Sequence, residues 1–254
     1  MSDNWLQRRP NGQAALRLFC FPSSGAGASL FQIWQRHVPR EIEVVGIQLP
    51  GREIRFNEEP YVDMLSLARK LVEVLSPYMD LPFAFYGHSM GSILSFEIVR
   101  ELRRRGLPGP THLFVGAYRA PQIPRDEKQI HRLGDKEMLA EVSRRYQSLP
   151  DEILESSELA ELFLVPLRAD VTMLETWRFT EDTPLDCPLT VFGGLQDGSV
   201  TRDQLLAWRE HTTSEFNLSM LPGGHLFVRE SYQLLLKAIT NILAPSVPSC
   251  TAIS

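Results

Sequence analysis

Apolar residues along the chain follow two periodicities, which predict two kinds of element. Short runs that are apolar almost throughout are typical of strands covered on both faces of a sheet. Such runs occur at residues 16–21, 43–48, 83–87, 112–117, 189–192 and 216–221. These segments are the predicted strands.

Between the strands, apolar residues recur at the three- and four-residue spacing of amphipathic helices. One series runs from Met64 to Leu75, with Asp63 as a candidate N-cap. A second runs from Ile93 to Leu102 and ends in arginines followed by Gly106, as helix C-termini often do. Two more helices are predicted at 202–210 and 231–243. This alternation indicates an α/β fold with a mostly parallel central sheet flanked by helices.

One long stretch breaks the alternation. Residues 125–180 show no strand pattern but contain helical segments at 136–146, 151–154 and 158–177. An insertion of about 55 residues is too long for a plain connection. We expect residues 1–124 and 181–244 to form the core, and 125–180 to form a mobile helical lid whose apolar side chains partly line a substrate chamber. The polar first dozen residues are expected to be frayed, and 245–254 to be a flexible tail.

Composition narrows the class of protein. The 254 residues are 43% hydrophobic and 22% charged, as in soluble globular chains, and the net charge of −5 disfavours a nucleic-acid partner. No apolar run is long enough to span a membrane, and the N-terminus lacks a signal-peptide core. The three cysteines form no paired motif, so neither a disulfide framework nor a metal site is predicted. A reduced, cytoplasmic protein is the default expectation.

The sequence G-H-S-M-G at residues 87–91 carries the first chemical signal. It follows a predicted strand and precedes a predicted helix, which is the context of a nucleophile elbow. Ser89 would sit on a sharp turn at positive φ, and Gly87 and Gly91 would remove side chains that otherwise collide. We therefore expect Ser89 to be a catalytic nucleophile.

A serine needs a base, and in such folds the acid and the histidine follow it along the chain. Asp197 lies on a glycine turn after the strand at 189–192, and His225 lies on a glycine-rich loop after the strand at 216–221. Both would reach the same edge of the sheet as Ser89. The spacing predicts a Ser89–His225–Asp197 triad.

Other residues compete for these roles. His211 is the main rival for the base, whereas His88 is expected to pack behind the elbow. Asp203 and Asp186 are rivals for the acid. Asp203 is more typical of a helix N-terminus, where a carboxylate caps the helix. Asp170, in the insertion, is expected to be an internal structural partner.

An oxyanion hole requires two backbone N–H groups. Met90, directly after the nucleophile, is expected to supply one. The other is expected from the loop S-S-G-A-G at residues 23–27, with Ser24 preferred and Ser23 or Gly25 as alternatives. The same loop could bind phosphate, but it lacks the Gly-Lys-Ser/Thr ending of a P-loop.

Five motifs along the chain together form a more specific pattern. They are F-P-S-S-G-A-G at 21–27, Q-L-P-G-R-E at 48–53, Y-G-H-S-M-G at 86–91, L-R-A-D at 167–170 and G-G-H-L-F at 223–227. Their order and spacing resemble the type II thioesterases, stand-alone enzymes that serve polyketide synthases and non-ribosomal peptide synthetases. The resemblance covers about residues 16–243. General esterases and lipases lack the P-G-R and L-R-A-D elements.

This resemblance implies an α/β-hydrolase fold with a helical lid, and a triad of Ser89, Asp197 and His225. It implies hydrolysis of stalled or aberrant acyl groups from the phosphopantetheine arm of carrier proteins, with neither metal nor cofactor on the enzyme. The family often has Ala-Gly-Gly where this chain has Ser24-Gly25-Ala26. Carrier domains are usually acidic, so a local basic surface is expected near the site despite the net negative charge.

Arg119 follows the strand at 112–117 and is expected to emerge at the catalytic edge, and Arg125, Arg144 and Arg145 lie in or beside the proposed lid. These arginines are the expected docking residues. The cluster 103–105 ends the helix that leaves the elbow and is expected on the far side. Two other functions fit the same pattern of residues. One is a general carboxylesterase acting on oxygen esters, and the other is a catalytically silent scaffold that only binds a partner.

Overall fold

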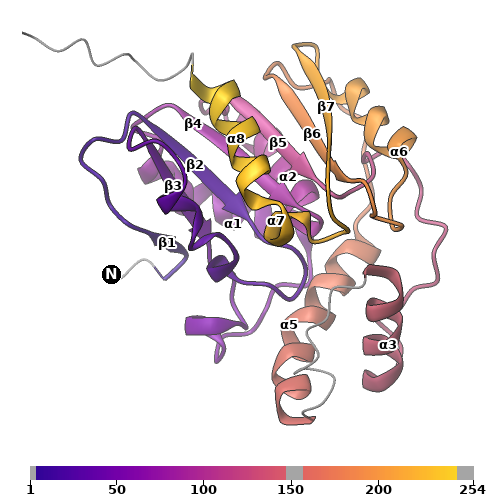
Figure 1. The fold of residues 1–254 in the computed structure, drawn as a ribbon. Coiled ribbons are helices and arrows are strands. Elements are labelled where there is room, and N and C mark those ends of the chain that lie inside the picture. Colours follow the sequence, from indigo (N-terminus) through magenta and orange to yellow (C-terminus); the bar gives the residue numbers. More distant parts are fainter. Residues whose placement is uncertain (1–3, 147–156, 245–254) are drawn as a thin grey trace, which may run out of the picture.

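A seven-stranded sheet forms the centre of the molecule, as seen in a computed structural model that describes residues 4–146 and 157–244 (Figure 1). The strands are β1 (Leu6–Arg8), β2 (Leu16–Phe21), β3 (Ile42–Ile47), β4 (Phe83–His88), β5 (His112–Gly116), β6 (Leu189–Gly194) and β7 (Phe216–Leu221). Their order is β1-β3-β2-β4-β5-β6-β7. Strand β1 runs antiparallel to β3, and the other neighbours are parallel. The predicted mostly parallel sheet is confirmed.

Helices cover both faces of the sheet and also form the long insertion between two of its strands. They are α1 (Met64–Leu75), α2 (Met90–Arg104), α3 (Asp135–Tyr146), α5 (Ser157–Thr176), α6 (Arg202–Leu206), α7 (Phe227–Glu230) and α8 (Tyr232–Leu243). Helices α1 and α2 lie on one face and α8 on the other (Figure 1). Successive strand residues point to opposite faces, so Phe19 joins the core under α1 and α2 while Leu18 joins the core under α8.

The ends of the helices follow local side-chain chemistry. The carboxylate of Asp63 accepts a hydrogen bond from the Ser66 N–H at 2.7 Å, which makes it the N-cap of α1 as predicted. The predicted helix at 202–210 instead divides into α6 and a 3₁₀ helix, Ala207–His211. Thr201 and Gln204 form a capping box at the start of α6.

The N-terminal segment corrects one expectation. Residues 6–8 were expected to be frayed, yet they form the edge strand β1. Arg8 forms an ion pair with the buried Glu43 at 2.8 Å, and Gln7 donates to Gln48 at 3.1 Å. The segment is too short and too polar to show a strand pattern in the sequence. It is held in place by its pairing with β3 and by these side chains.

The long insertion between β5 and β6 leaves the sheet at the carboxyl ends of its strands (Figure 1). Helices α3 and α5 pack on each other through a small apolar cluster that includes Met138, Leu139, Val142, Leu164 and Leu167. The segment predicted at 151–154 and the tail predicted at 245–254 lie outside the described residues.

No helix in the described ranges has the length and apolar character needed to cross a bilayer. Cys20 and Cys187 are both buried and unpaired. Burial raises the pKa of the Cys187 thiol to about 12.

Candidate active site

The turn between β4 and α2 holds Ser89 at φ 53° and ψ −114°. Such a positive φ is uncommon for a residue with a side chain and stores backbone strain. A Cβ added at Gly87 would lie 2.1 Å from the Gly91 carbonyl oxygen, and one added at Gly91 would lie 2.2 Å from that of Phe21. Only glycine fits at these two positions, for the steric reason that the motif suggested.

A chain of hydrogen bonds joins Ser89 to two loops at the same edge of the sheet. His225 Nε2 lies 3.0 Å from Ser89 Oγ, and His225 Nδ1 lies 3.0 Å from Asp197 Oδ2. Asp197 follows β6 and His225 follows β7, so the carboxyl ends of three parallel strands bring the groups together. The side chains of His225 and Asp197 are 5% and 1% exposed. Water is therefore largely excluded from the hydrogen bond between His225 and Asp197.

Electrostatics keep the Asp197 carboxyl charged. Burial alone would raise its pKa, but the hydrogen bonds and charge of His225, together with hydrogen bonds from Ser199, hold the pKa below its usual value. A charged carboxylate can accept the N–H of His225 Nδ1. That leaves Nε2 free to accept a proton from Ser89.

Ser199 is a member of this site that sequence reasoning missed. Its hydroxyl lies 2.6 Å from Asp197 Oδ1 and 3.0 Å from His225 Nδ1, and its N–H donates to Asp197 Oδ1 at 2.9 Å. The only sequence signal was its place two residues after the candidate acid. The short turn there folds the hydroxyl back onto the carboxylate.

None of the rival side chains joins the hydrogen bonds among Ser89, His225 and Asp197. His88 is fully buried and donates from Nε2 to the His225 carbonyl oxygen at 2.8 Å, while its Nδ1 accepts from the Tyr86 hydroxyl. Burial lowers the pKa of His88 to about 3, so it stays neutral and supports the loop that bears His225. The ring of His211 contacts Gln122 and Trp208, and Asp203 lies in the first turn of α6.

The loop of residues 23–27 lies beside the elbow. The Gly25 N–H donates to Asp170 Oδ2 at 2.8 Å, so it is unavailable to a substrate and the Gly25 alternative is removed. Across the described ranges, no acceptor pairs with the N–H of Ser24 or of Met90, which is the first residue of α2. Ser23 and Ser24 both line a cavity with Ser89. Met90 and Ser24 therefore remain the candidate oxyanion donors, with Ser23 as the alternative.

The insertion covers the serine. A cavity of about 40 Å³ separates Ser89 and His225 from apolar side chains of the insertion, namely Ile130, Val142, Leu167, Val171 and Leu174. A larger cleft of about 540 Å³ lies outside it, between the C-terminal end of α3 and the loops that bear Asp197 and His225. Tyr146 lines both spaces, and its ring centre is 4.7 Å from that of His225. The aromatic ring thus stands between the cleft and the nucleophile.

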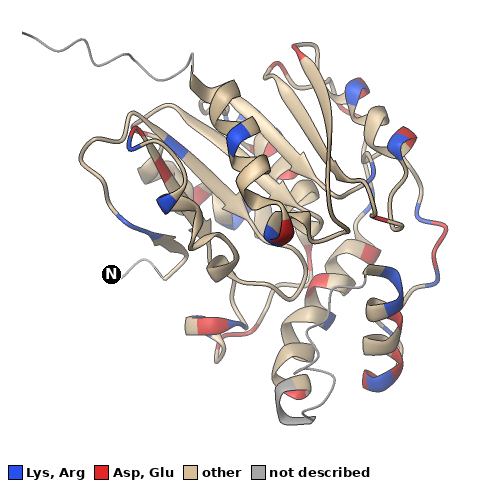
Figure 2. Ribbon diagram, in the orientation of Figure 1, with Lys and Arg blue, Asp and Glu red and all other residues tan. Residues whose placement is uncertain are grey.

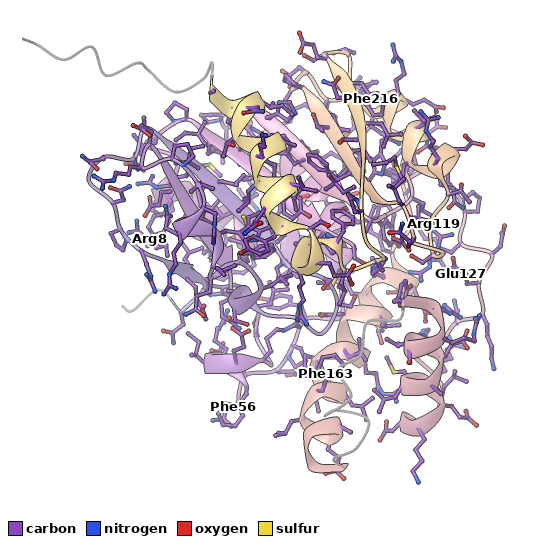
Figure 3. All side chains as sticks on the ribbon, viewed as in Figure 1. Arg8, Phe56, Arg119, Glu127, Phe163 and Phe216 are labelled. Atoms are coloured by element: carbon purple, nitrogen blue, oxygen red, sulfur yellow. The ribbon has the colours of Figure 1, made fainter. Side chains whose placement is uncertain are left out.

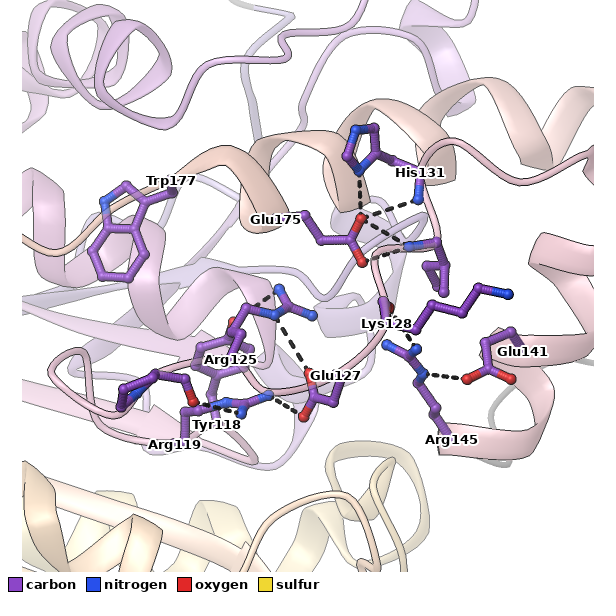
Figure 4. Close-up of polar contacts among 12 residues, drawn as sticks. Tyr118, Arg119, Arg125, Glu127, Lys128, His131, Glu141, Arg145, Glu175 and Trp177 are labelled. Carbon is purple, nitrogen blue, oxygen red and sulfur yellow. Dashed lines mark hydrogen bonds and ion pairs between the residues drawn. The ribbon is translucent and has the colours of Figure 1, made fainter.

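Charged residues surround the outer cleft, but most are already paired. Arg119 is buried and forms an ion pair with Glu127, marked by a dashed line in Figure 4, and Figure 3 shows where the two residues lie in the whole molecule. Arg119 was expected to emerge at the catalytic edge as a docking residue, but its side chain is buried against Glu127 and offers little charge to a partner. Arg125 also approaches Glu127, at 3.5 Å.

Helix α3 mixes the two signs of charge along its length (Figure 2). Arg144 and Arg145 both bind Glu141, and they lower the pKa of that carboxyl to about 2. Arg145 is largely covered, but the side chain of Arg144 is 69% exposed. Lys128 is also exposed at the cleft (Figure 4). Arg144 and Lys128 are the cations at the cleft that solvent reaches most freely.

Known proteins resemble the chain in both sequence and fold. Residues 16–243 match the family model described as Thioesterase domain. The chain is similar to the gramicidin S biosynthesis protein GrsT of Aneurinibacillus migulanus, with 41% identity over 93% of this chain and 94% of that protein. Among solved structures it resembles RedJ, a thioesterase of the prodiginine pathway of Streptomyces coelicolor, with TM-score 0.86 and 37% identity over 92% of this chain and 93% of that one. It also resembles BorB, a type II thioesterase from the borrelidin biosynthetic cluster, with TM-score 0.86 and 32% identity over 96% and 99% of the two chains.

Proposed function

The chain belongs to the thioesterase domain family, and we propose that it releases stalled or aberrant acyl groups from the phosphopantetheine arms of carrier proteins in a polyketide or non-ribosomal peptide assembly line. One observation carries the proposal. The hydrogen-bonded chain Ser89–His225–Asp197 faces a cavity in a protein whose relatives along nearly the whole length serve such pathways. The fold and the acyl-thioester hydrolase class follow from the family.

The geometry supports a serine-hydrolase reaction. His225 Nε2, at 3.0 Å from Ser89 Oγ, takes the hydroxyl proton as the oxygen attacks the thioester carbonyl. Asp197 holds the Nδ1–H tautomer and stabilises the imidazolium. The N–H groups of Met90 and Ser24 receive the negative charge that develops on the carbonyl oxygen. The proton then passes from His225 to the leaving sulfur.

The leaving group suits this mechanism. A thiol of pKa near 8.5 departs more readily than an alcohol. Water, activated by His225, then attacks the acyl-serine and restores the hydroxyl. The reaction as proposed draws on no cofactor held by the enzyme, since the phosphopantetheine arm is part of the substrate.

The shape of the site suggests how the substrate enters. The outer cleft of about 540 Å³ suits the pantetheine arm, whereas the inner cavity of about 40 Å³ holds no acyl chain of useful length. We therefore assign residues 125–180 to a lid that opens for the acyl group, above a core formed by 1–124 and 181–244. Opening of such a lid takes microseconds to milliseconds.

Acidic carrier domains are the proposed partners, docked beside the outer cleft. Arg144, although paired with Glu141, and Lys128 offer exposed positive charge there, while the side chain of Arg119 is buried against Glu127. The unpaired Cys20 and Cys187 fit a reducing compartment, so we place the protein in the cytoplasm.

The proposal is tested with a carrier protein loaded with an acyl-phosphopantetheine. Ser89→Ala should lose about 10⁴- to 10⁶-fold in turnover while the melting temperature is retained. Ser76→Ala is the matched control, because this serine caps a carbonyl of α1 far from the elbow. A variant that keeps a tenth of wild-type turnover would show that Ser89 is not the nucleophile. Faster cleavage of a matched oxygen ester would instead favour a general carboxylesterase.

A further inference from the structure

Two sequence motifs, P-G-R and L-R-A-D, contribute nothing directly to the triad, yet they meet beside it. The Arg52 guanidinium contacts both oxygens of Asp170, with Nη1 at 2.5 Å from Oδ2 and Nη2 at 2.8 Å from Oδ1. The two side chains are 5% and 1% exposed. This is a buried bidentate pair between the core and the helix α5 of the insertion.

Both partners also hold the loop of residues 23–27. Asp170 Oδ2 accepts the Gly25 N–H at 2.8 Å, and Arg52 Nη1 donates to the Ala26 carbonyl oxygen at 3.2 Å. Gly25 has a φ of 74°, and Phe163 and Leu167 of α5 cover the space where its Cβ would stand. The peptide group before Gly25 and the peptide group after Ala26 are thus both held by a single ion pair.

We propose that Arg52 and Asp170 are positioning residues for the oxyanion hole. By binding the Gly25 N–H and the Ala26 carbonyl, they orient the loop so that the Ser24 N–H faces the thioester oxygen above Ser89. A carboxylate that only anchored α5 would need no bond to the loop backbone. This inference rests on the proposed function, since it concerns how the same site stabilises its transition state.

The predicted signature is a loss of turnover without a loss of substrate binding. An oxyanion donor acts on the charge that develops during reaction, and removal of one such donor costs about 10²- to 10³-fold in kcat. In Asp170→Asn the NH₂ group replaces either Oδ1, which faces Arg52 Nη2, or Oδ2, which faces both Arg52 Nη1 and the Gly25 N–H, so the bidentate pair that holds the loop is broken in either orientation. We expect kcat to fall about 30- to 100-fold, and KM for a small acyl-pantetheine to change less than about threefold.

Two control variants separate this role from plain structural effects. Glu97→Gln disturbs another buried ion pair, the one between Glu97 and Arg100. This pair lies about two turns after the start of α2, away from the oxyanion loop. Glu175→Gln weakens a second anchor of α5, because this carboxylate accepts from the Ile130 and His131 N–H groups and contacts no residue of the oxyanion loop. Both controls should keep kcat within about threefold of wild type, whatever their melting temperatures.

A boronic acid that forms a tetrahedral adduct with Ser89 provides a second readout. Asp170→Asn should weaken its binding about as much as it lowers kcat, while a non-hydrolysable thioether analogue binds as before. Arg52→Lys keeps a charge beside Asp170 but cannot span both Asp170 and Ala26. Arg52→Lys should lower kcat about tenfold, and it replaces Asp170→Asn as the test variant if Asp170→Asn fails to fold.

Three results would overturn the inference: unchanged kcat in Asp170→Asn or in Arg52→Lys, a rise in KM at constant kcat, or an equal loss of kcat in Glu175→Gln. These outcomes leave the proposed function standing as long as Ser89→Ala remains inactive. Activity in Ser89→Ala would refute the proposed function itself.

Discussion

The hydroxyl of Ser199 should contribute measurably to turnover through its contacts with the acid and the base. It donates to Asp197 Oδ1 at 2.6 Å, and its oxygen faces the His225 Nδ1 atom at 3.0 Å. In Ser199→Ala both contacts vanish, but the N–H of residue 199 still binds Asp197 Oδ1 at 2.9 Å. The carboxylate therefore keeps one of its two local donors.

The size of the effect follows from these contacts. A hydrogen bond to a charged group contributes about 1.5–3 kcal/mol, which corresponds to about 10- to 150-fold in rate. Because one donor remains and the Asp197–His225 bond is kept, we expect the lower end, about a tenfold fall in kcat. Asp197→Asn should cost far more, about 10⁴-fold, because the amide selects the wrong imidazole tautomer.

Steady-state hydrolysis of a small acyl-pantetheine measures both variants. KM should change little in Ser199→Ala, since Ser199 orients the acid and the base rather than the acyl group. Ser199→Thr retains the hydroxyl and should recover kcat to within about threefold of wild type. A kcat for Ser199→Ala within twofold of wild type would refute the reasoning, as would a loss as large as that of Asp197→Asn.

Three further outcomes are expected. In hydrogen exchange, α3 should exchange faster than β4 and β5; equal protection would contradict a mobile lid. Burial lowers the pKa of His88 to about 3 and the pKa values of His112 and His211 to about 4, so the unfolded chain, with histidine pKa near 6.5, binds more protons below that pH. The free energy of unfolding should therefore be fully retained above pH 6.5. Below that pH it should fall by about 1.4 kcal/mol per pH unit for each of these histidines. A midpoint of urea unfolding that stays constant from pH 7 to pH 5 would contradict this prediction. Charge reversal of Arg144 and Lys128 together should raise KM for an acidic acyl-carrier about tenfold and weaken its salt dependence, with hydrolysis of a small acyl-pantetheine unchanged; reversal of the arginines that end α2 serves as the control.

The catalytic edge was predictable because its signals are local or follow chain order. The strained turn at Ser89 requires glycine at positions 87 and 91, and all three residues lie within one five-residue motif that can be recognised in the sequence. Parallel strands place the residues after β6 and β7 at the same edge as Ser89, so Asp197 and His225 could be expected there from topology alone.

Other features depend on partners that are distant in sequence. The Arg52–Asp170 pair joins two motifs that resemblance singled out but whose physical role no local pattern reveals. The burial of Arg119 depends on Glu127, which folds back from the loop that leaves β5. Counting arginines near a predicted edge could not show which of them were already neutralised, because pairing is a property of the folded surface.

The Arg52–Asp170 pair also sets a rule for exchanging parts between related enzymes. Because α3 and α5 form one contiguous insertion between β5 and β6, the segment invites transplantation as a cassette to change acyl preference. A graft that brings a different residue at position 170 would leave the buried Arg52 of the recipient without its counter-ion and the Gly25 N–H without its acceptor. Successful chimaeras should therefore be those in which the recipient supplies Arg52 and the donated insertion supplies Asp170. Libraries built at the insertion boundaries can be sorted by that criterion before any protein is made.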